Sequence, residues 1–124
     1  MLVSIAGSAW DAAQLLDLGN LQQWSEDLSG EQIRGILGQV PGDSRINVAC
    51  ILTAVAEGDR VAIKRQAHRL KGMAANIGAL RLAELARTLE YGVFETGDLV
   101  SAAAALPAVL EDTLLVIEQL KIPD

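Results

Sequence analysis

The chain has very few of the residues that form disulfides, metal centres and aromatic cores. Cys50 is the only cysteine, so no internal disulfide can form, and this favours a reducing compartment such as the cytoplasm. With one histidine, His68, and no acidic cluster beside either residue, the sequence predicts no metal site. Aromatic residues make up 3% of the chain, which argues against β-sheets, because strands favour aromatic and β-branched side chains.

The sequence also lacks the patterns of a membrane protein and of a secreted protein. Charged residues interrupt the apolar runs well short of the roughly 20 residues that span a bilayer, so we predict no membrane-spanning helix. The first six residues have no basic flank of the kind that begins a secretory signal. We therefore expect a cytoplasmic protein that does not associate with membranes.

Alanine and leucine dominate what is present, and hydrophobic residues make up 51% of the 124. Such a composition favours closely packed helices, and the length suits one domain with a single core. Apolar residues recur at helical spacing in five segments, after a short turn expected over 8–16. The predicted helices cover about 18–28, 30–56, 59–77, 79–95 and 98–121.

These helices predict an all-α fold. Four of them, joined by short loops, are expected to form an antiparallel up-down-up-down four-helix bundle over about 30–121. The segment 1–28 is then an accessory N-terminal addition, and 1–124 is a single domain.

Several helix ends carry capping residues. Ser29 and Gln32 have the spacing of a capping box, in which each side chain satisfies a backbone amide of the other residue. Aspartates precede three further helices as expected N-caps: Asp17, Asp59 and Asp98. Within the segment 30–56, Pro41-Gly42 is the weak point, because a proline inside a helix removes a hydrogen bond. We predict one long kinked helix, with a break at 41–44 as the alternative.

Charge is unevenly distributed along the chain. The total is −6, which argues against general nucleic-acid binding. The window 60–87 nevertheless holds seven basic residues and one acid, Glu84, a sum of +6, so the rest of the chain carries −12. The basic residues of this window are Arg60, Lys64, Arg65, Arg69, Lys71, Arg81 and Arg87. Such a patch on an acidic body suits docking of an acidic partner, although it also fits an ordinary solvated helix face.

His68 lies in this basic window, beside the apolar stripe of the predicted helix 59–77. Counting outward from a short turn centred on residue 79, His68 is eleven residues before the turn and Glu90 is eleven after it. In an antiparallel pair of helices these two residues are therefore level with each other. A carboxylate that accepts a hydrogen bond from one ring nitrogen fixes the tautomer and leaves the other nitrogen free to act as a nucleophile.

Gly72 lies one helical turn after His68. A glycine inside a helix costs about 1 kcal/mol relative to alanine, so its presence calls for a reason. The missing side chain clears space for a phosphoryl group or a partner's loop. Lys71, with Lys64 and Arg65 one turn before His68, is placed to offset the negative charge of such a group.

The run His68-Arg69-Leu70-Lys71-Gly72, followed by Gly78, Leu82 and Leu89-Glu90, resembles the H-x-L-K-G…G…L…LE pattern of histidine-containing phosphotransfer (HPt) domains. The specific motif covers about residues 67–90, and the expected helical layout extends the resemblance to the whole bundle. The resemblance implies a monomeric bundle whose histidine accepts a phosphoryl group from one receiver-domain aspartate and passes it to another.

Residue by residue, the resemblance makes His68 the phosphoryl acceptor, Lys71 the phosphate-facing cation and Glu90 the residue that orients the imidazole. Gly72 becomes the clearance position and Gly78 the interhelical turn. The implied partners are the receiver domains of response regulators and hybrid histidine kinases. The chain would have no intrinsic cofactor, because the receiver supplies Mg²⁺, and it would have no autokinase activity, because no ATP-binding segment is evident.

The expected docking surface surrounds His68. Its candidate residues are Gly72, Lys64, Arg65, Arg69 and Ala75, together with Leu21 and Trp24 as exposed apolar residues of the N-terminal helix. The alternative for the apolar pair is that they cover the end of the bundle. The alternative function is an interaction module that is never phosphorylated and docks an acidic protein through its basic patch.

Overall fold

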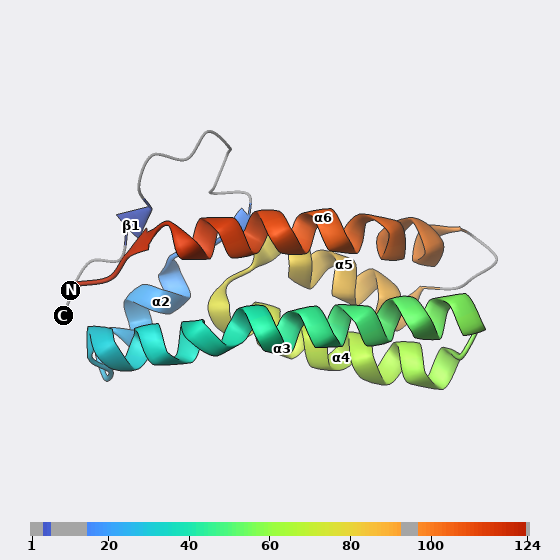
Figure 1. Cartoon of the computed structure of the whole chain (residues 1–124), viewed down its shortest axis with the longest axis horizontal. Helices are drawn as coiled ribbons and strands as arrows, with labels where there is room; N and C mark the ends of the chain where they lie inside the picture. The colour runs from blue at the N-terminus through green and yellow to red at the C-terminus, as the bar shows by residue number, and fades with distance from the viewer. Residues whose placement is uncertain (1–3, 6–14, 93–96, 124) are drawn as a thin grey trace.

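The computed structural model describes residues 4–5, 15–92 and 97–123, and these residues are predominantly helical (Figure 1). A short strand pair joins segments near the two ends of the chain, with Ser4 opposite Lys121 and Ile5 opposite Leu120. The sequence did not predict this pair. The elements are β1 (Ser4–Ile5), α2 (Gly19–Trp24), α3 (Gly30–Glu57), α4 (Arg60–Ile77), α5 (Leu80–Tyr91), α6 (Asp98–Glu118) and β2 (Leu120–Lys121).

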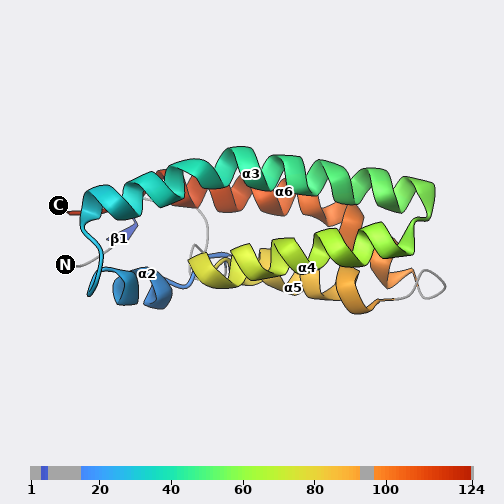
Figure 2. The same cartoon turned by 90° about the horizontal axis from the view of Figure 1, so that it is seen from below.

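The four long helices enclose the core. α3 contacts α4, α4 contacts α5, α5 contacts α6, and α6 contacts α3 in turn. The colour gradient runs in opposite directions along consecutive members of this set, while the short α2 lies beside the end of α4 (Figures 1 and 2). The all-α prediction is confirmed for the described residues. Fully buried aliphatic side chains from every long helix fill the interior, among them Ile33, Ile51, Ile63, Leu70, Leu82, Leu89 and Leu106.

Some helix ends differ from the prediction. α2 stops at Trp24 rather than near 28, and Asp17 accepts a hydrogen bond from the Gly19 amide at 2.8 Å although Leu18 is the N-cap. α5 stops at Tyr91, because Gly92 has extended backbone and does not continue the helix. Residues 93–95 of the predicted helix, like residues 8–14 of the predicted turn, lie outside the described part of the chain.

The last helix also differs at both ends. Gly97, not Asp98, is the N-cap, and Asp98 is an acidic residue of the first turn instead. The helix ends at Glu118, where the chain turns into β2 instead of continuing to residue 121.

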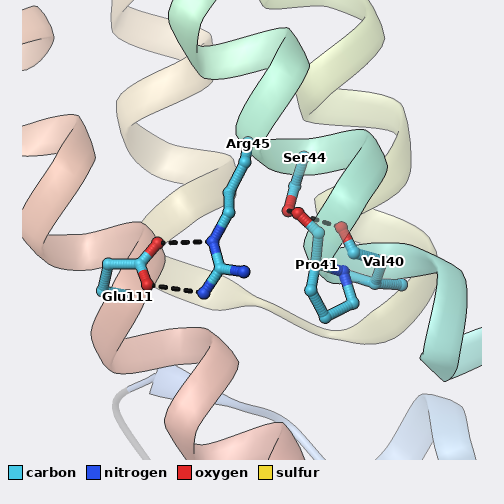
Figure 3. Close-up of polar contacts among 5 residues, drawn as sticks. All are labelled: Val40, Pro41, Ser44, Arg45 and Glu111. Carbon is cyan, nitrogen blue, oxygen red and sulfur yellow. Dashed lines mark hydrogen bonds and ion pairs between the residues drawn. The ribbon is translucent and has the colours of Figure 1, made fainter.

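α3 is continuous through Pro41, which confirms one long helix rather than a break at 41–44. The capping box of Ser29 and Gln32 is formed at its start. Near the proline, the buried Ser44 hydroxyl donates to the Val40 carbonyl at 2.5 Å. Arg45 then makes a two-pronged contact with Glu111 of α6, from Nη2 to Oε1 at 2.7 Å and from Nε to Oε2 at 3.1 Å (Figure 3). The segment after the proline is therefore tied to the neighbouring helix.

α6 is long and apolar enough to cross a membrane by length and composition alone, so the prediction that no segment resembles such a helix was too strict. Its first charged pair after Asp98 is Glu111-Asp112, which leaves a long uncharged stretch before it. One face of the helix is buried in the bundle, through Leu99, Ala102, Ala103, Leu106, Leu110 and Leu114. The core helix of a soluble protein passes the same test, so the length and composition of α6 are only weak evidence for a membrane span.

The turn between α4 and α5 depends on Gly78, which adopts a left-handed backbone with φ of 78°. The amide of Asp17 donates to its carbonyl at 2.7 Å, so the N-terminal segment is seated directly on the turn. A Cβ at this position would lie 2.2 Å from the Asp17 carbonyl oxygen. This glycine thus serves both the turn and the docking of the segment before α2.

Gly78→Ala is therefore expected to lower the free energy of unfolding by clearly more than Gly58→Ala. Both glycines have positive φ, and an L-residue there costs roughly 1–2 kcal/mol. A Cβ at Gly58 meets nothing within 4 Å, so that variant isolates the backbone term. Urea unfolding of both variants measures the difference, and equal losses would show that the contact with Asp17 contributes nothing.

Candidate functional site

His68 is displayed on the outer side of α4. The helix is fixed by Asp59, whose side chain accepts from the Ala62 amide at 3.1 Å, and by Gly78 at its other end. Its inner face is buried through Ile63, Ala67, Leu70, Ala74 and Ile77. The His68 side chain is 70% exposed, so the imidazole is accessible while its helix is held firmly.

The buried partner of this imidazole comes from α5. Nδ1 of His68 lies 2.9 Å from Oε1 of Glu90, whose side chain is only 6% exposed. The contact is the one predicted by counting from the interhelical turn. Because an ionised carboxylate can only accept, the contact assigns the hydrogen of the neutral imidazole to Nδ1 and leaves the Nε2 lone pair of that tautomer without a proton.

Lys71 contacts the second oxygen of the same carboxylate. Its Nζ lies 2.6 Å from Oε2 of Glu90, as an ion pair rather than an aligned hydrogen bond, and 3.3 Å from the hydroxyl of Tyr91. The Tyr91 ring centroid is 4.9 Å from the ammonium. The sequence pattern did not identify Tyr91, and nothing in the motif marks it. The ammonium predicted to face a phosphate is, in this structure, engaged by two residues of α5.

The ion pair decides the charge state of the buried carboxylate. The contact with Lys71, followed by the hydrogen bond from His68, lowers the pKa of Glu90 below its ordinary value of 4.5, although burial acts in the opposite direction. The same contact with Glu90, and then Tyr91, raises the pKa of Lys71. Glu90 is therefore an anion at neutral pH and can stabilise positive charge on the imidazole.

This lowered pKa predicts a pH-dependent effect of Glu90→Gln. A carboxyl whose pKa is lower in the folded state contributes stability above its unfolded pKa, and that stability is lost as the pH falls through the folded value. The free energy of unfolding of the variant should therefore fall further below that of wild type at pH 7 than it does below pH 4. Urea unfolding of both proteins at the two pH values measures this, and an equal difference at both would contradict an ionised, paired Glu90.

The surface next to His68 is open at Gly72. A Cβ built on this residue meets nothing within 4 Å, so no contact within the described chain requires a glycine there. Ala75, one turn further on, is exposed, and its carbonyl accepts from Nδ2 of Asn20 at 2.6 Å. The open space predicted at Gly72 is therefore present among the described residues.

The other predicted basic residues fall on two sides of α4. Lys64 and Arg65 are exposed one turn before His68, and Lys64 lines a pocket together with Glu90 and Tyr91. Arg69 instead lines the groove between α3 and α4, with Met73. The structure therefore brings Lys64 to the Glu90 side of the site and directs Arg69 away from it.

The predicted docking role of the N-terminal helix needs correction. Leu21 is 0% exposed and belongs to the core, because α2 packs on the end of α4. Trp24 is partly buried against the same core. Asn20 anchors the helix through the Ala75 carbonyl, a contact that no sequence pattern indicated. Leu21 therefore covers the end of the bundle, as the alternative held, and it offers no surface to a partner.

Comparison with known protein families places these residues in context. The model of the Hpt domain family matches residues 35–121, which is more than half of the chain. The match includes the whole of α4 and α5, and with them His68, Lys71, Gly72 and Glu90. Searches of curated proteins and of solved structures gave no significant match.

Proposed function

Because this chain belongs to the Hpt domain family, whose domains are phosphotransfer modules of phosphorelay signalling, we propose that His68 is its phosphoryl acceptor. In this proposal a receiver-domain aspartyl phosphate of a hybrid histidine kinase donates the group. His68 then passes it to the aspartate of a response regulator. The chain is a carrier in the relay and has no autokinase activity.

The observation that carries the proposal is the contact between Nδ1 of His68 and Oε1 of Glu90. It directs the unprotonated Nε2 away from the buried carboxylate, on a side chain that is 70% exposed. A nucleophile oriented by a buried acceptor follows the same logic as other activated imidazoles, in which the carboxylate fixes the tautomer and stabilises the cation that forms.

The transfer step balances with the groups at hand. The Nε2 lone pair attacks phosphorus, the N–P bond forms, and the P–O bond to the partner's aspartate breaks, which returns that aspartate to a carboxylate. The proton on Nδ1 stays in its hydrogen bond with Glu90, so the phosphorylated ring carries a positive charge beside the buried anion. Transfer to a second receiver reverses these bond changes.

The partner supplies what the chain does not hold. In this proposal the receiver domain brings Mg²⁺ to the phosphoryl oxygens, and the chain needs no metal or cofactor of its own. Lys71 and the exposed Lys64 and Arg65 add positive charge around the group, while Gly72 leaves the approach open. We further propose that the four long helices form the antiparallel up-down-up-down bundle of the family, in a monomer that works in the cytoplasm.

The test is to mix the protein with a receiver domain labelled on its aspartyl phosphate. Radiolabel is expected to move to this chain within the reaction time, in an acid-labile and base-stable form, as a phosphoramidate requires. Addition of a second, unphosphorylated receiver should then remove the label. Absence of transfer from any receiver domain of the host, with binding retained, would favour an interaction module that docks an acidic partner.

A further inference from the structure

The two carboxylate oxygens of Glu90 contact two different residues of α4, and both of these residues can carry a positive charge. Oε1 faces His68 and Oε2 faces Lys71, at 2.9 and 2.6 Å. The carboxylate is buried, so its orientation is determined by these two contacts and not by water. Whatever holds the Lys71 ammonium in place consequently also holds the carboxylate that orients the imidazole.

Tyr91 is the residue that holds this ammonium from the other side. Its hydroxyl lies 3.3 Å from Nζ of Lys71, and the face of its ring lies next to the ammonium, whose Nζ is 4.9 Å from the ring centroid. The residue is 62% exposed, so packing in the core does not account for its position. The Lys71 side chain, covered from this side, is 27% exposed.

We infer that Tyr91 is a positioning residue of the transfer site, which holds the Lys71 ammonium against Glu90 and thereby keeps the carboxylate directed at His68. The inference rests on the proposed function, since it assigns Tyr91 a part in the transfer by His68. It also gives Lys71 a task before any phosphate arrives. The lysine pairs with Oε2 of the buried carboxylate, and this contact fixes the orientation in which Oε1 accepts the hydrogen bond from the imidazole.

The groups around the carboxylate are few in the described chain. His68 and Lys71 face it from α4, Tyr91 follows it on α5, and the pocket beside it is lined by Arg60 and Lys64. From α6 the pocket is lined by the uncharged Leu99. Removal of the Tyr91 hydroxyl is therefore expected to loosen the Lys71 ammonium first, and to change the environment of the Glu90 carboxylate through the weakened contact with Lys71.

The experiment compares wild type with Tyr91→Phe, Tyr91→Ala and Lys71→Met in two measurements. The first is the ¹³C-carboxyl NMR titration of Glu90 in the free, unphosphorylated protein. The second is the transfer rate from a phosphorylated receiver domain, as a function of receiver concentration. Tyr91→Phe removes only the hydroxyl, Tyr91→Ala removes the ring as well, and Lys71→Met removes the charge while it keeps the length of the side chain.

Tyr91→Phe is expected to raise the titration midpoint of Glu90 by less than Lys71→Met does, with Tyr91→Ala between the two. At saturating receiver the transfer rate of Tyr91→Phe should fall about two- to twelve-fold, the range expected for one lost hydrogen bond, while the half-saturating receiver concentration stays unchanged. The inference is overturned if neither Tyr91 variant moves the Glu90 titration, or if only the half-saturating concentration changes, since Tyr91 would then be a docking residue. If wild type itself accepts no phosphoryl group, the proposed function fails, and the titration still decides whether Tyr91 positions Glu90.

Discussion

His68→Gln is expected to accept no phosphoryl group at all from a receiver domain that phosphorylates the wild type. The variant keeps a polar side chain of similar reach, and its amide can donate to Oε1 of Glu90, so the buried carboxylate keeps a partner on that side. An amide nitrogen, however, has no lone pair available for attack on phosphorus. The loss should therefore be complete, because the side chain supplies the bond-forming atom and does not merely assist.

The fold of this variant should be unchanged, because the replaced side chain is largely in solvent. Circular dichroism and urea unfolding serve as the control, and binding to an unphosphorylated receiver should persist. Label incorporated at the wild-type level by a folded His68→Gln would exclude the histidine as the acceptor. Unchanged signalling by the variant in cells would favour the interaction module.

Gly72→Gln is expected to slow transfer at least about tenfold while it stabilises the folded protein. A helical side chain leans toward the N-terminus and covers the turn before its own Cα, so a glutamine at this position lies over the turn that carries His68. A loss of about 1.4 kcal/mol in the approach of the partner already gives a factor of ten. Helix propensity acts the other way and should add somewhat under about 1 kcal/mol of stability, since no contact opposes the new side chain.

Gly35→Gln is the matched control. Gly35 is also an exposed glycine within a helix, and a Cβ added there would meet nothing within 4 Å. Gly35 is near the start of α3, twelve residues before Asn47, the α3 residue that contacts α4 through Gln66. A side chain added at Gly35 is therefore far along α3 from the part of α4 that carries His68. This variant should gain similar stability and transfer at the wild-type rate. Equal transfer rates for both variants would show that Gly72 does not keep the approach to His68 open.

The pairing of His68 with Glu90 was predictable because it depends on backbone geometry alone. Helices have a constant rise, and a turn as short as the one at Gly78 fixes the register of the two helices that it joins. Equal separation from the turn therefore placed the two residues level. The clearance at Gly72 followed in the same way, from its position one turn beyond the imidazole.

The position of the Lys71 ammonium could not be obtained from spacing. A lysine side chain has several rotatable bonds, and its position depends on which acceptors compete for it. Spacing pointed Lys71 toward the face of His68, whereas the buried Oε2 of Glu90 and the Tyr91 hydroxyl attract it across to α5. A tyrosine directly after the orienting glutamate carried no signal of its own.

The position of the N-terminal segment on the bundle also could not be predicted from the sequence pattern. Leu21 and Trp24 lie on one side of a short helix, and the pattern is the same whether that side faces a partner or the bundle. Long-range contacts decide between the two, namely the amide of Asp17 on the Gly78 carbonyl and Asn20 on the Ala75 carbonyl. The β1–β2 pair depends on the same kind of distant pairing.

The phosphoryl acceptor is tested most directly by a ³¹P–¹⁵N correlation spectrum of the phosphorylated, ¹⁵N-labelled protein. His68 is the only histidine, so a phosphorus–nitrogen coupling to an imidazole identifies the residue without ambiguity. We expect phosphorus to be bonded to Nε2, with Nδ1 protonated toward Glu90. Phosphorus bonded to Nδ1, or to an oxygen with no nitrogen coupling, would contradict the assignment of Nε2 as the nucleophile.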